Sequence, residues 1–423
     1  MELSASQAAS ARRVVAGIPL PVVAVALAVA ATLLGDSMLY AVMPSRPEAW
    51  ALSVPAVGVL LSANRLVRLV TNPVAALAFE RFGPRGPFTF ALVLSVVVTL
   101  TYGWATAFVV LLVARMAWGT CWSLLRLGGF WTVLDEATDQ NRGLLMGAYS
   151  AIVRMGSVGG ALLGATLTDA VGHRPTLTAF AVVMAFAGAT WWVSTRGRPV
   201  RRGAAAAPTE GAAGLVTVLA DRRLLVTGAG GLLTGLVFSG LVTASLGFFL
   251  SEHFGEEIGF AGAAVGVTSA TGLLLGAQWS LGLPLAPILG HLSDRYGRLR
   301  VTTGGFALGA GGLALLAGTA TVPLILVGVL VSFVAATALN VGLSATAGDL
   351  APPERRSAVM SSYATFLDLG SALGPLVGLS FASLATLRGM YGAAAVALLL
   401  AAFLFRIAFA GGTPRDAGTP AAR

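Results

Sequence analysis

Seven charged side chains stand inside long apolar stretches of this sequence, where an unpaired charge would be costly in a bilayer. Charges in such positions pair with one another, carry protons or hold ionic ligands. None of the three histidines lies in the middle of an apolar stretch, so a proton carrier among these residues would be a carboxylate. The seven residues are Asp36, Asp368, Arg65, Arg68, Arg115, Arg126 and Arg154.

Their depth along the stretches predicts two ion pairs, Asp36 with Arg115 and Asp368 with Arg68. Each pair has two interpretations. It is either a static salt bridge that holds two helices together, or a switch in which protonation of the carboxylate releases the arginine. A switch would couple proton flow to a change of access, with Asp36, Arg115 and Asp368 as the coupling residues.

The arginines outnumber the acids, so some guanidinium groups need another partner. A buried unpaired guanidinium is untenable without water or an anion, and its planar fork recognises carboxylate and phosphate groups well. We therefore predict that a substrate carries an anionic group held by Arg65, Arg126 or Arg154. The alternative is that these side chains extend to the membrane surface or bond to backbone carbonyls.

Polar and aromatic neighbours extend the predicted binding region. Asn64, Arg65 and Arg68 share one face of a predicted helix at 100° per residue. Nearby tryptophans are candidates to stack on an aromatic substrate, although packing alone would also explain them. The predicted substrate cavity comprises Asn64, Arg65, Arg68, Trp122, Arg126, Arg154, Gln278 and Trp279.

The composition shows what must position these residues. Of 423 residues, 56% are hydrophobic and 11% charged, whereas a soluble protein would carry about 25% charged residues. Apolar runs of about 20 residues recur along the chain, and a segment that crosses lipid alone must be helical. The first run is too long for a cleavable signal peptide, and the single cysteine excludes a disulfide framework. The predicted helices cover 20–43, 54–79, 88–106, 108–132, 144–168, 175–194, 224–250, 261–290, 301–318, 321–346, 358–382 and 388–410.

Loop arginines predict the orientation. Most of them lie on one side of the predicted spans, which also holds both termini and the linker. Because positive loops remain in the cytoplasm, we expect both termini and the linker to be cytoplasmic in a bacterial inner membrane. The predicted division is an N-terminal six-helix half (1–198), a linker (199–222) and a C-terminal six-helix half (223–423).

The halves are related by an internal repeat. A shift of 214 residues lays the second predicted helix on the eighth, with Gly58 on Gly272, and the fifth on the eleventh. The same shift places Arg154 at the position equivalent to Asp368, opposite Gln278 and Trp279. Small residues let helices approach closely, and we expect such contacts at Gly119, Gly156, Gly160, Gly164, Gly370, Gly374 and Gly378.

A loop motif carries a family resemblance. After the eighth predicted helix the chain reads Gly290 to Arg298, with Asp294-Arg295 inside, and a weaker copy at Glu80 follows the second. With these motifs and the repeat, the sequence resembles the major facilitator superfamily. The resemblance implies an all-α membrane protein of twelve transmembrane helices in two pseudo-symmetric six-helix bundles. It also implies a cytoplasmic gate at Glu80, Arg81, Gly83, Gly290, Asp294, Arg295, Gly297 and Arg298. Glu80 would meet the start of the eleventh helix and Asp294 the start of the fifth.

Two further features resemble exporters of this superfamily. Arg115 and Gly119 have the spacing of its Arg-x-x-x-Gly signature, and the glycine-rich fifth helix is similar to that of drug/proton antiporters, with Ala161 where proline is expected. In that family the first and fourth helices line the cavity, which favours Asp36 as the proton carrier. The alternative interpretation is that these glycines only allow neighbouring helices to pack closely.

The leading prediction is proton-coupled export of a small amphiphilic molecule. Uptake or exchange of an organic anion is the alternative, and a non-transporting membrane sensor is an alternative of another class. We expect no enzyme activity, cofactor, metal or nucleic-acid partner, because the sequence lacks a phosphate loop, a metal cluster and a nucleophile with its base. The expected partners of this monomer are the substrate, protons and the lipid bilayer.

Overall fold

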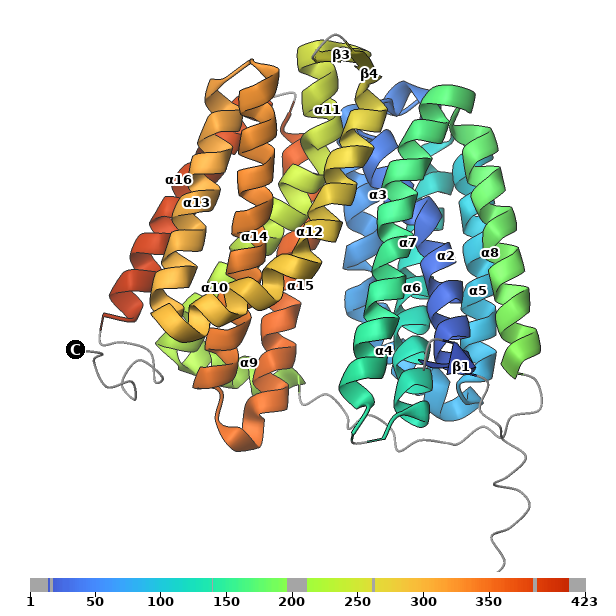
Figure 1. The fold of residues 1–423 in the computed structure, drawn as a ribbon, viewed down its shortest axis with the longest axis horizontal. Coiled ribbons are helices and arrows are strands. Elements are labelled where there is room, and N and C mark those ends of the chain that lie inside the picture. Colours follow the sequence, from blue (N-terminus) through green and yellow to red (C-terminus); the bar gives the residue numbers. More distant parts are fainter. Residues whose placement is uncertain are drawn as a thin grey trace, which may run out of the picture.

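The computed structural model describes residues 14–15, 18–138, 140–195, 211–260, 263–382 and 386–410. These residues form two helical bundles side by side (Figure 1). The first contains α2 (Leu20–Val42), α3 (Val54–Leu66), α4 (Arg68–Phe82), α5 (Arg85–Trp104), α6 (Phe108–Glu136), α7 (Arg142–Val171) and α8 (His173–Thr195). The second contains α9 (Gly211–Ala220), α10 (Arg222–Thr234), the π-helix η2 (Gly235–Val242), α11 (Thr243–Phe254), α12 (Val267–Tyr296), α13 (Arg298–Gly318), α14 (Val322–Leu350), α15 (Arg356–Ser380) and α16 (Leu387–Ala408).

Eleven helical segments of the described chain are long and apolar enough to cross a membrane. Two of them are composite: α3 continues into α4, and α10 continues through η2 into α11. The twelfth long helix is α15, which carries Asp368. The predicted fold of twelve membrane helices in two six-helix bundles is confirmed.

Three local features differ from the expected helices. The second span breaks at Val67, between α3 and α4. The seventh contains the π-helix, a form that usually marks a local irregularity within an α-helix. The expected helix at 261–290 was placed too early, because α12 begins only at Val267. An antiparallel hairpin of β3 (Glu257–Phe260) and β4 (Ala263–Gly266) precedes it, where glycines weaken a helix and β-branched residues suit a strand.

Short elements complete the chain. The predicted linker at 199–222 contains α9, a helix that the sequence did not suggest. Residues 199–210 of the linker lie outside the described part of the chain. A Cβ on Gly214 of α9 would collide with the carbonyl of Ala358 in α15, so α9 packs directly on the second bundle. The remaining elements are β1 (Val14–Val15), β2 (Ile18–Pro19), η1 (Pro47–Trp50) and η3 (Pro353–Arg355).

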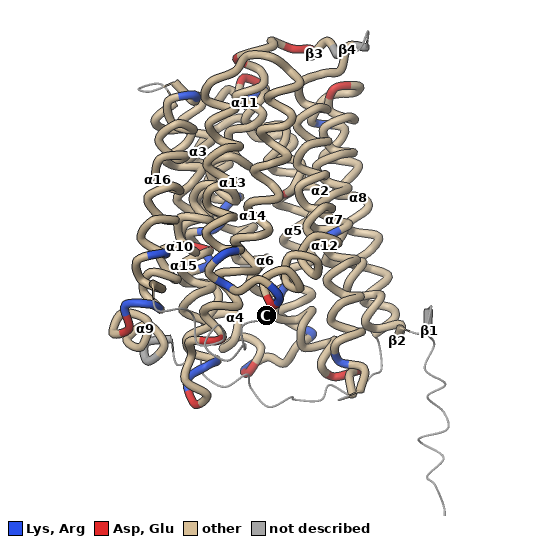
Figure 2. The backbone as a smooth tube through the Cα atoms, turned by 60° about the vertical axis from the view of Figure 1, so that its left-hand side comes forward, with Lys and Arg blue, Asp and Glu red and all other residues tan. Residues whose placement is uncertain are grey.

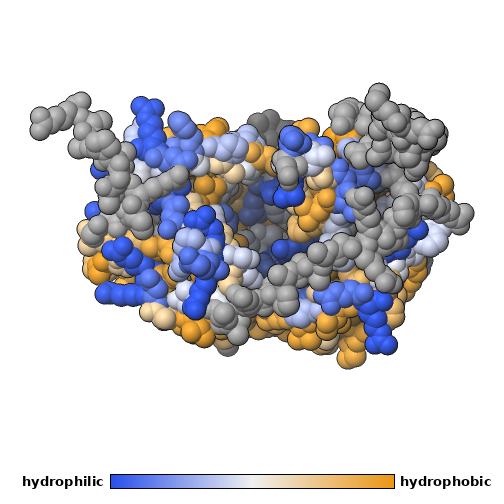
Figure 3. Space-filling model, turned by 90° about the horizontal axis from the view of Figure 1, so that it is seen from below, coloured by the Kyte–Doolittle hydropathy of each residue, from blue (hydrophilic) through white to orange (hydrophobic). Residues whose placement is uncertain are grey.

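The two ends of the molecule differ in charge and in closure. We call the end that carries the turns at 83–84, 140–141, 297 and 351–355 the arginine-rich end; it is at the bottom of Figure 1, and Figure 2 shows basic residues gathered there. Seen from that end, the surface is hollowed between the bundles (Figure 3). Toward the opposite end the bundles touch, with α3 against α15 and α7 against α12.

These two contacts repeat with the offset found in the sequence. A Cβ on Gly58 would lie 2.7 Å from the carbonyl oxygen of Pro375, and one on Gly272 would collide with that of Ala161. Both members of the second contact lie 214 residues from their counterparts in the first. The internal repeat is therefore also a repeat of the interface between the bundles.

The predicted packing glycines all lie at close helix crossings. On α7 they face α2, on α15 they face the span formed by α10, η2 and α11, and on α6 one faces α3. At each of them a Cβ would fall closer to the neighbouring helix than real side chains allow, so this prediction is confirmed. The residues are Gly119, Gly156, Gly160, Gly164, Gly370, Gly374 and Gly378.

Candidate functional site

A buried carboxylate forms the centre of the site in the first bundle. Asp36 of α2 is 8% exposed. Its Oδ1 atom accepts hydrogen bonds from Nη1 of Arg115 at 2.6 Å and from Nδ2 of Asn64 at 3.2 Å. The predicted pair between Asp36 and Arg115 is confirmed, and it joins α2, α3 and α6.

Arg115 is held from several sides. Its side chain is fully buried, and its Nε atom donates to the carbonyl of Leu60 at 3.2 Å. The rings of Tyr40 and Tyr102 lie 5.6 and 5.8 Å from the guanidinium carbon, within the range of a cation–π contact. Nη2 has no hydrogen-bond partner among the described residues. The charge of Asp36 is therefore the main compensation for burying this cation.

Two further arginines connect to the pair. Arg68 donates from Nη2 to Oδ1 of Asn64 at 2.6 Å, so Asn64 bridges Arg68 to Asp36. The guanidinium of Arg65 lies 5.4 Å from the ring of Tyr40, which it shares with Arg115. Both branches lead from the buried pair toward the space between the bundles.

The predicted pair between Arg68 and Asp368 is wrong for this structure. No ion pair joins the two within the described ranges; Arg68 instead bonds to Asn64 and lies 5.7 Å from the ring of Trp122. Asp368 of α15 has an exposed side chain. The physical reason is that Asn64 offers an acceptor one helical turn away, whereas Asp368 belongs to the other bundle.

Two arginines cross from the first bundle to the second. Arg65 donates from Nη1 to the carbonyls of Ser239 and Ser371, each at 3.1 Å. Arg154 of α7 donates from Nη1 to the carbonyl of Trp279 at 3.2 Å, which confirms its predicted place opposite this segment of α12. Each guanidinium thus touches the other bundle through backbone acceptors and keeps further N–H groups in the cavity region.

Two adjoining cavities lie between the bundles. The first has a volume of about 410 Å³ and the second about 360 Å³, and both are lined by Arg154 and Trp279. The first is lined by Arg65, Arg154, Ser239, Thr243, Gln278, Trp279, Gly282, Ala286, Phe333, Ala336, Thr337, Asn340, Val341 and Ser344. The second is lined by Leu33, Trp122, Arg126, Phe130, Tyr149, Ser150, Val153, Arg154, Ser157 and Trp279. These linings contain three arginines and no acidic residue.

Six of the eight predicted cavity residues line this space, and two lie behind it. Asn64 is fully buried and Arg68 partly buried, where they serve Asp36 instead. The sequence reasoning missed Thr337, Asn340 and Ser344 of α14. Their spacing of three and four residues places them on one helix face, and that periodicity is the signal that would have found them.

The predicted gate lies at the arginine-rich end. Arg298 is its most buried member: it bonds to Asp294 at 2.7 Å, to Asp349 at 3.1 Å and to Ser293 at 3.0 Å, all within the second bundle. Glu80 is exposed, and among the described residues no bond joins it to the start of α15. The expected contact of Glu80 is absent because the bundles stand apart at this end.

The other members of the predicted gate have local contacts. The guanidinium of Arg81 lies 5.6 Å from the ring of Phe82, and that of Arg295 lies 5.5 Å from the ring of Tyr296. Gly83 and Gly297 end their helices with φ of 71° and 91°, a conformation that favours glycine. Gly290 leaves room for a Cβ, whose nearest neighbour would be Val341 at 3.9 Å.

The opposite end holds a latch that the sequence did not suggest. Asp169, near the end of α7, accepts from Arg46 at 2.9 Å in its own bundle. It also accepts from the backbone N–H of Ser269 at 2.9 Å and from its hydroxyl at 2.5 Å. Ser269 lies in the first turn of α12, where the helix dipole favours an anion. We call Arg46, Asp169 and Ser269 the latch, because it fastens the two bundles together.

Comparisons with known proteins agree with this architecture. A model of the Major Facilitator Superfamily matches residues 25–282 and 232–423. The human synaptic vesicular amine transporter is 28% identical over 136 residues, which are 31% of this chain and 26% of that protein. The match therefore spans about a quarter of the relative's length.

Solved structures are similar over nearly the whole chain. The nucleoside transporter NupG has a TM-score of 0.79 at 12% identity, covering 92% of this chain and 99% of that one. A bacterial homologue of the human lysosomal transporter Spinster, inward-facing and occupied, has a TM-score of 0.73 at 15% identity and covers 92% and 96%. A POT family transporter in complex with 5-aminolevulinic acid has a TM-score of 0.73 at 11% identity and covers 94% and 97%. At these identities the likeness concerns the fold.

Proposed function

The chain belongs to the Major Facilitator Superfamily of secondary transporters, and from that premise we propose that it carries a small amphiphilic molecule with an anionic group. The observation that carries this proposal is the charge of the cavity lining, which has Arg65, Arg126 and Arg154 and no acid. Trp122 and Trp279 supply aromatic surface for the apolar part of the substrate. A lipophilic cation would meet only like charges there, at a cost that grows as water is excluded.

Arg154 has the central place in the proposed binding mode. It lines both cavities and already touches the second bundle through the carbonyl of Trp279. An anion bound to its remaining N–H groups would be shared between the bundles. Arg65, which holds two carbonyls of the second bundle, would contribute in the same way from the first cavity. Substrate binding would therefore favour approach of the bundles at the open, arginine-rich end.

Alternating access is the proposed mechanism. In the conformation described, the cavities open toward the arginine-rich end and the latch closes the opposite end. Release of the latch and closure of the arginine-rich end would expose the same site to the other side. We place the arginine-rich end in the cytoplasm of a bacterial inner membrane, since positive loops favour that side, and the direction of transport as export.

Proton coupling is proposed to act through Asp36. Both of its hydrogen bonds within the described chain use Oδ1, and the side chain is 10% exposed. A proton on Oδ2 would weaken the hold on Arg115. The freed cation would then act on Tyr40, whose ring also contacts Arg65 of the first cavity. This path links protonation of Asp36 to an arginine that touches both substrate and the second bundle.

Transport of an amine is the second candidate. The matched human protein is named for amines, and Asp368 is an exposed acid on α15. The lining of the two cavities weighs against it, because a cation would have to bind beside three arginines.

Three ligands with one scaffold distinguish the candidates: 3-phenylpropionate, 3-phenylpropylamine and 3-phenylpropanamide, tested by thermal shift on purified protein. A ligand at about a hundred times its dissociation constant stabilises by roughly 2.7 kcal/mol. We expect stabilisation by the carboxylate alone, lost in Arg154→Gln and retained in Arg174→Gln, whose arginine lies at the opposite end. Stabilisation by the amine but not the carboxylate would refute the anionic substrate and favour the second candidate.

A further inference from the structure

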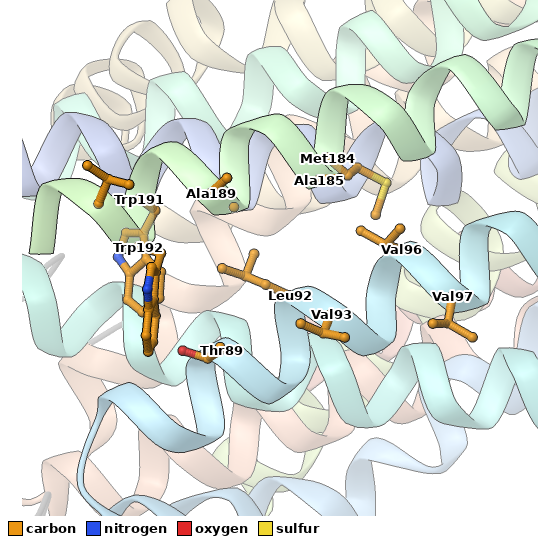
Figure 4. A pocket seen from close by; sticks show the side chains of 12 residues that line it. Thr89, Leu92, Val93, Val96, Val97, Met184, Ala185, Ala189, Trp191 and Trp192 are labelled. Carbon is orange, nitrogen blue, oxygen red and sulfur yellow. The ribbon is translucent and has the colours of Figure 1, made fainter. Parts of the chain in front are cut away.

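An apolar groove of about 400 Å³ runs along the outside of the first bundle, between α5 and α8 (Figure 4). Its walls are formed mainly by Leu92, Val93 and Val97 of α5 and by Met184 and Ala185 of α8. Val93 is 61% and Val97 53% exposed, so the groove opens outward, where hydrocarbon would surround a membrane helix.

Two polar atoms without a partner lie at one end of this groove. Thr89 and Trp191 both belong to its lining. Their Oγ1 and Nε1 atoms are buried, and neither has a hydrogen-bond partner among the described residues. Trp191 is only 4% exposed. Buried polar groups are almost always satisfied, so these two atoms indicate a polar group that occupies the groove when the protein is in its membrane.

The residues along the groove are graded in polarity. From the arginine-rich end, α5 carries Arg85 just outside the groove, where its Nη2 atom donates to the carbonyl of Thr195 at the end of α8. The groove itself is then lined by Thr89, by Leu92 and Val93, and finally by Val97. At 1.5 Å per residue, Thr89 and Val97 are separated by about 12 Å along the helix axis. The order is a cation, then hydrogen-bonding groups, then hydrocarbon walls, which is the order of phosphate, ester and acyl chain in a phospholipid.

We propose that this groove is a binding site for one acyl chain of an anionic phospholipid, with its ester carbonyl at Trp191 and Thr89 and its phosphate toward Arg85. A helix of a second copy is about 10 to 12 Å across with its side chains and is too wide for this volume. Trp191 Nε1 can only donate, so it needs an acceptor such as an ester carbonyl. Because α5 and α8 belong to the same bundle, the site persists while the bundles move.

Photo-crosslinking tests the site. The full chain is placed in nanodiscs of phosphatidylglycerol that include a fraction with a diazirine on one acyl chain, irradiated and digested. We expect adducts concentrated on the peptides that contain Val93 to Val97 and Met184 to Gly188. Adducts spread in proportion to exposure over all lipid-facing helices would overturn the proposal.

Matched variants locate the chain within the groove. A Cβ on Gly188 would have 3.8 Å to Leu92, so Gly188→Leu fills the groove without forcing the backbone. Its control is Gly392→Leu on α16, where a Cβ would have 3.9 Å to Ala317. We expect at least a fivefold loss of adducts in the first variant and no change in the second. Equal labelling of both variants would show that the lipid is not seated in the groove.

The polar end is tested separately. Trp191→Phe removes one hydrogen-bond donor and keeps the ring, which should weaken lipid retention by about two- to tenfold in native mass spectrometry. Unchanged lipid retention in Trp191→Phe would show that the ester carbonyl does not lie at Trp191. Disulfide-linked dimers of Val97→Cys in nanodiscs, formed in high yield, would mean that a second copy covers the groove and would also overturn the proposal.

Discussion

Loss of the latch should release the closed end of the molecule. Asp169 accepts three hydrogen bonds, of which two, from the N–H and hydroxyl of Ser269, cross between the bundles. A hydrogen bond to a charged group contributes about 1.5 to 3 kcal/mol. Asp169→Asn keeps one acceptor oxygen, and the carboxylate is 18% exposed. We therefore expect a loss of about 2 kcal/mol for the closed arrangement, which changes the ratio of closed to open states by roughly 30-fold.

Double electron–electron resonance measures this ratio directly. Spin labels at Glu48→Cys and Glu257→Cys stand on exposed positions of the two bundles at the latch end. The parent protein should give mainly the short distance of the closed end, and Asp169→Asn should add a longer one. Ser269→Ala removes the hydroxyl donor but leaves the N–H, so its shift should be intermediate. Asp135→Asn, an exposed acid near the arginine-rich end, is the control.

Equal distance distributions for Asp169→Asn and the control would refute a closing role for the latch. That result would mean that the glycine contacts between the bundles close this end by themselves.

Three other predictions follow from contacts described above. Asp36→Asn should abolish accumulation driven by a pH gradient in proteoliposomes while substrate exchange continues; accumulation at the parent rate would exclude Asp36 as the coupling group. Gly370→Ala forces a Cβ into α10 and should cost about 1 to 3 kcal/mol, seen as a lower Tm, whereas Gly392→Ala, which has room, should not lower it. Arg298→Gln should lower the Tm more than Arg295→Gln, because Arg298 is 8% exposed and holds two carboxylates; equal shifts would show that the buried network contributes little.

Hydropathy and periodicity were sufficient for the twelve spans and the repeat. Apolar runs report the bilayer, and every span must satisfy its own backbone as a helix. The break at Val67 and the π-helix left no such trace, because a change of backbone hydrogen bonding within a span does not change the hydropathy of its residues. The hairpin before α12 was missed because β3 falls in the gap between two predicted helices, and because Val265 of β4 suits an apolar helix as well as a strand.

For the candidate site, the depth of each residue along its span was informative, but the sequence did not show which residues face each other across the bundles. Asp36 and Arg115 lie at the same depth within one bundle, so their pairing could be predicted. Asp368 and Arg68 also share a depth but belong to different bundles, and the sequence does not say how far the bundles stand apart. Asp169 was missed because it falls just beyond a predicted span, where an acid looks like an ordinary loop residue.

The paired glycine contacts between the bundles have a mechanical consequence. Gly58 on Pro375 and Gly272 on Ala161 bring backbone against backbone, with no long side chain between them that a rotamer change could displace. Two such contacts, related by the repeat, define an axis through the molecule. Each bundle can rotate about this axis as a rigid body. A methyl group added at Gly58 alone would push the bundles apart at one of the two contacts and tilt the rotation axis. The bundles would then open by different amounts at the two ends of the molecule, even with every cavity residue in place.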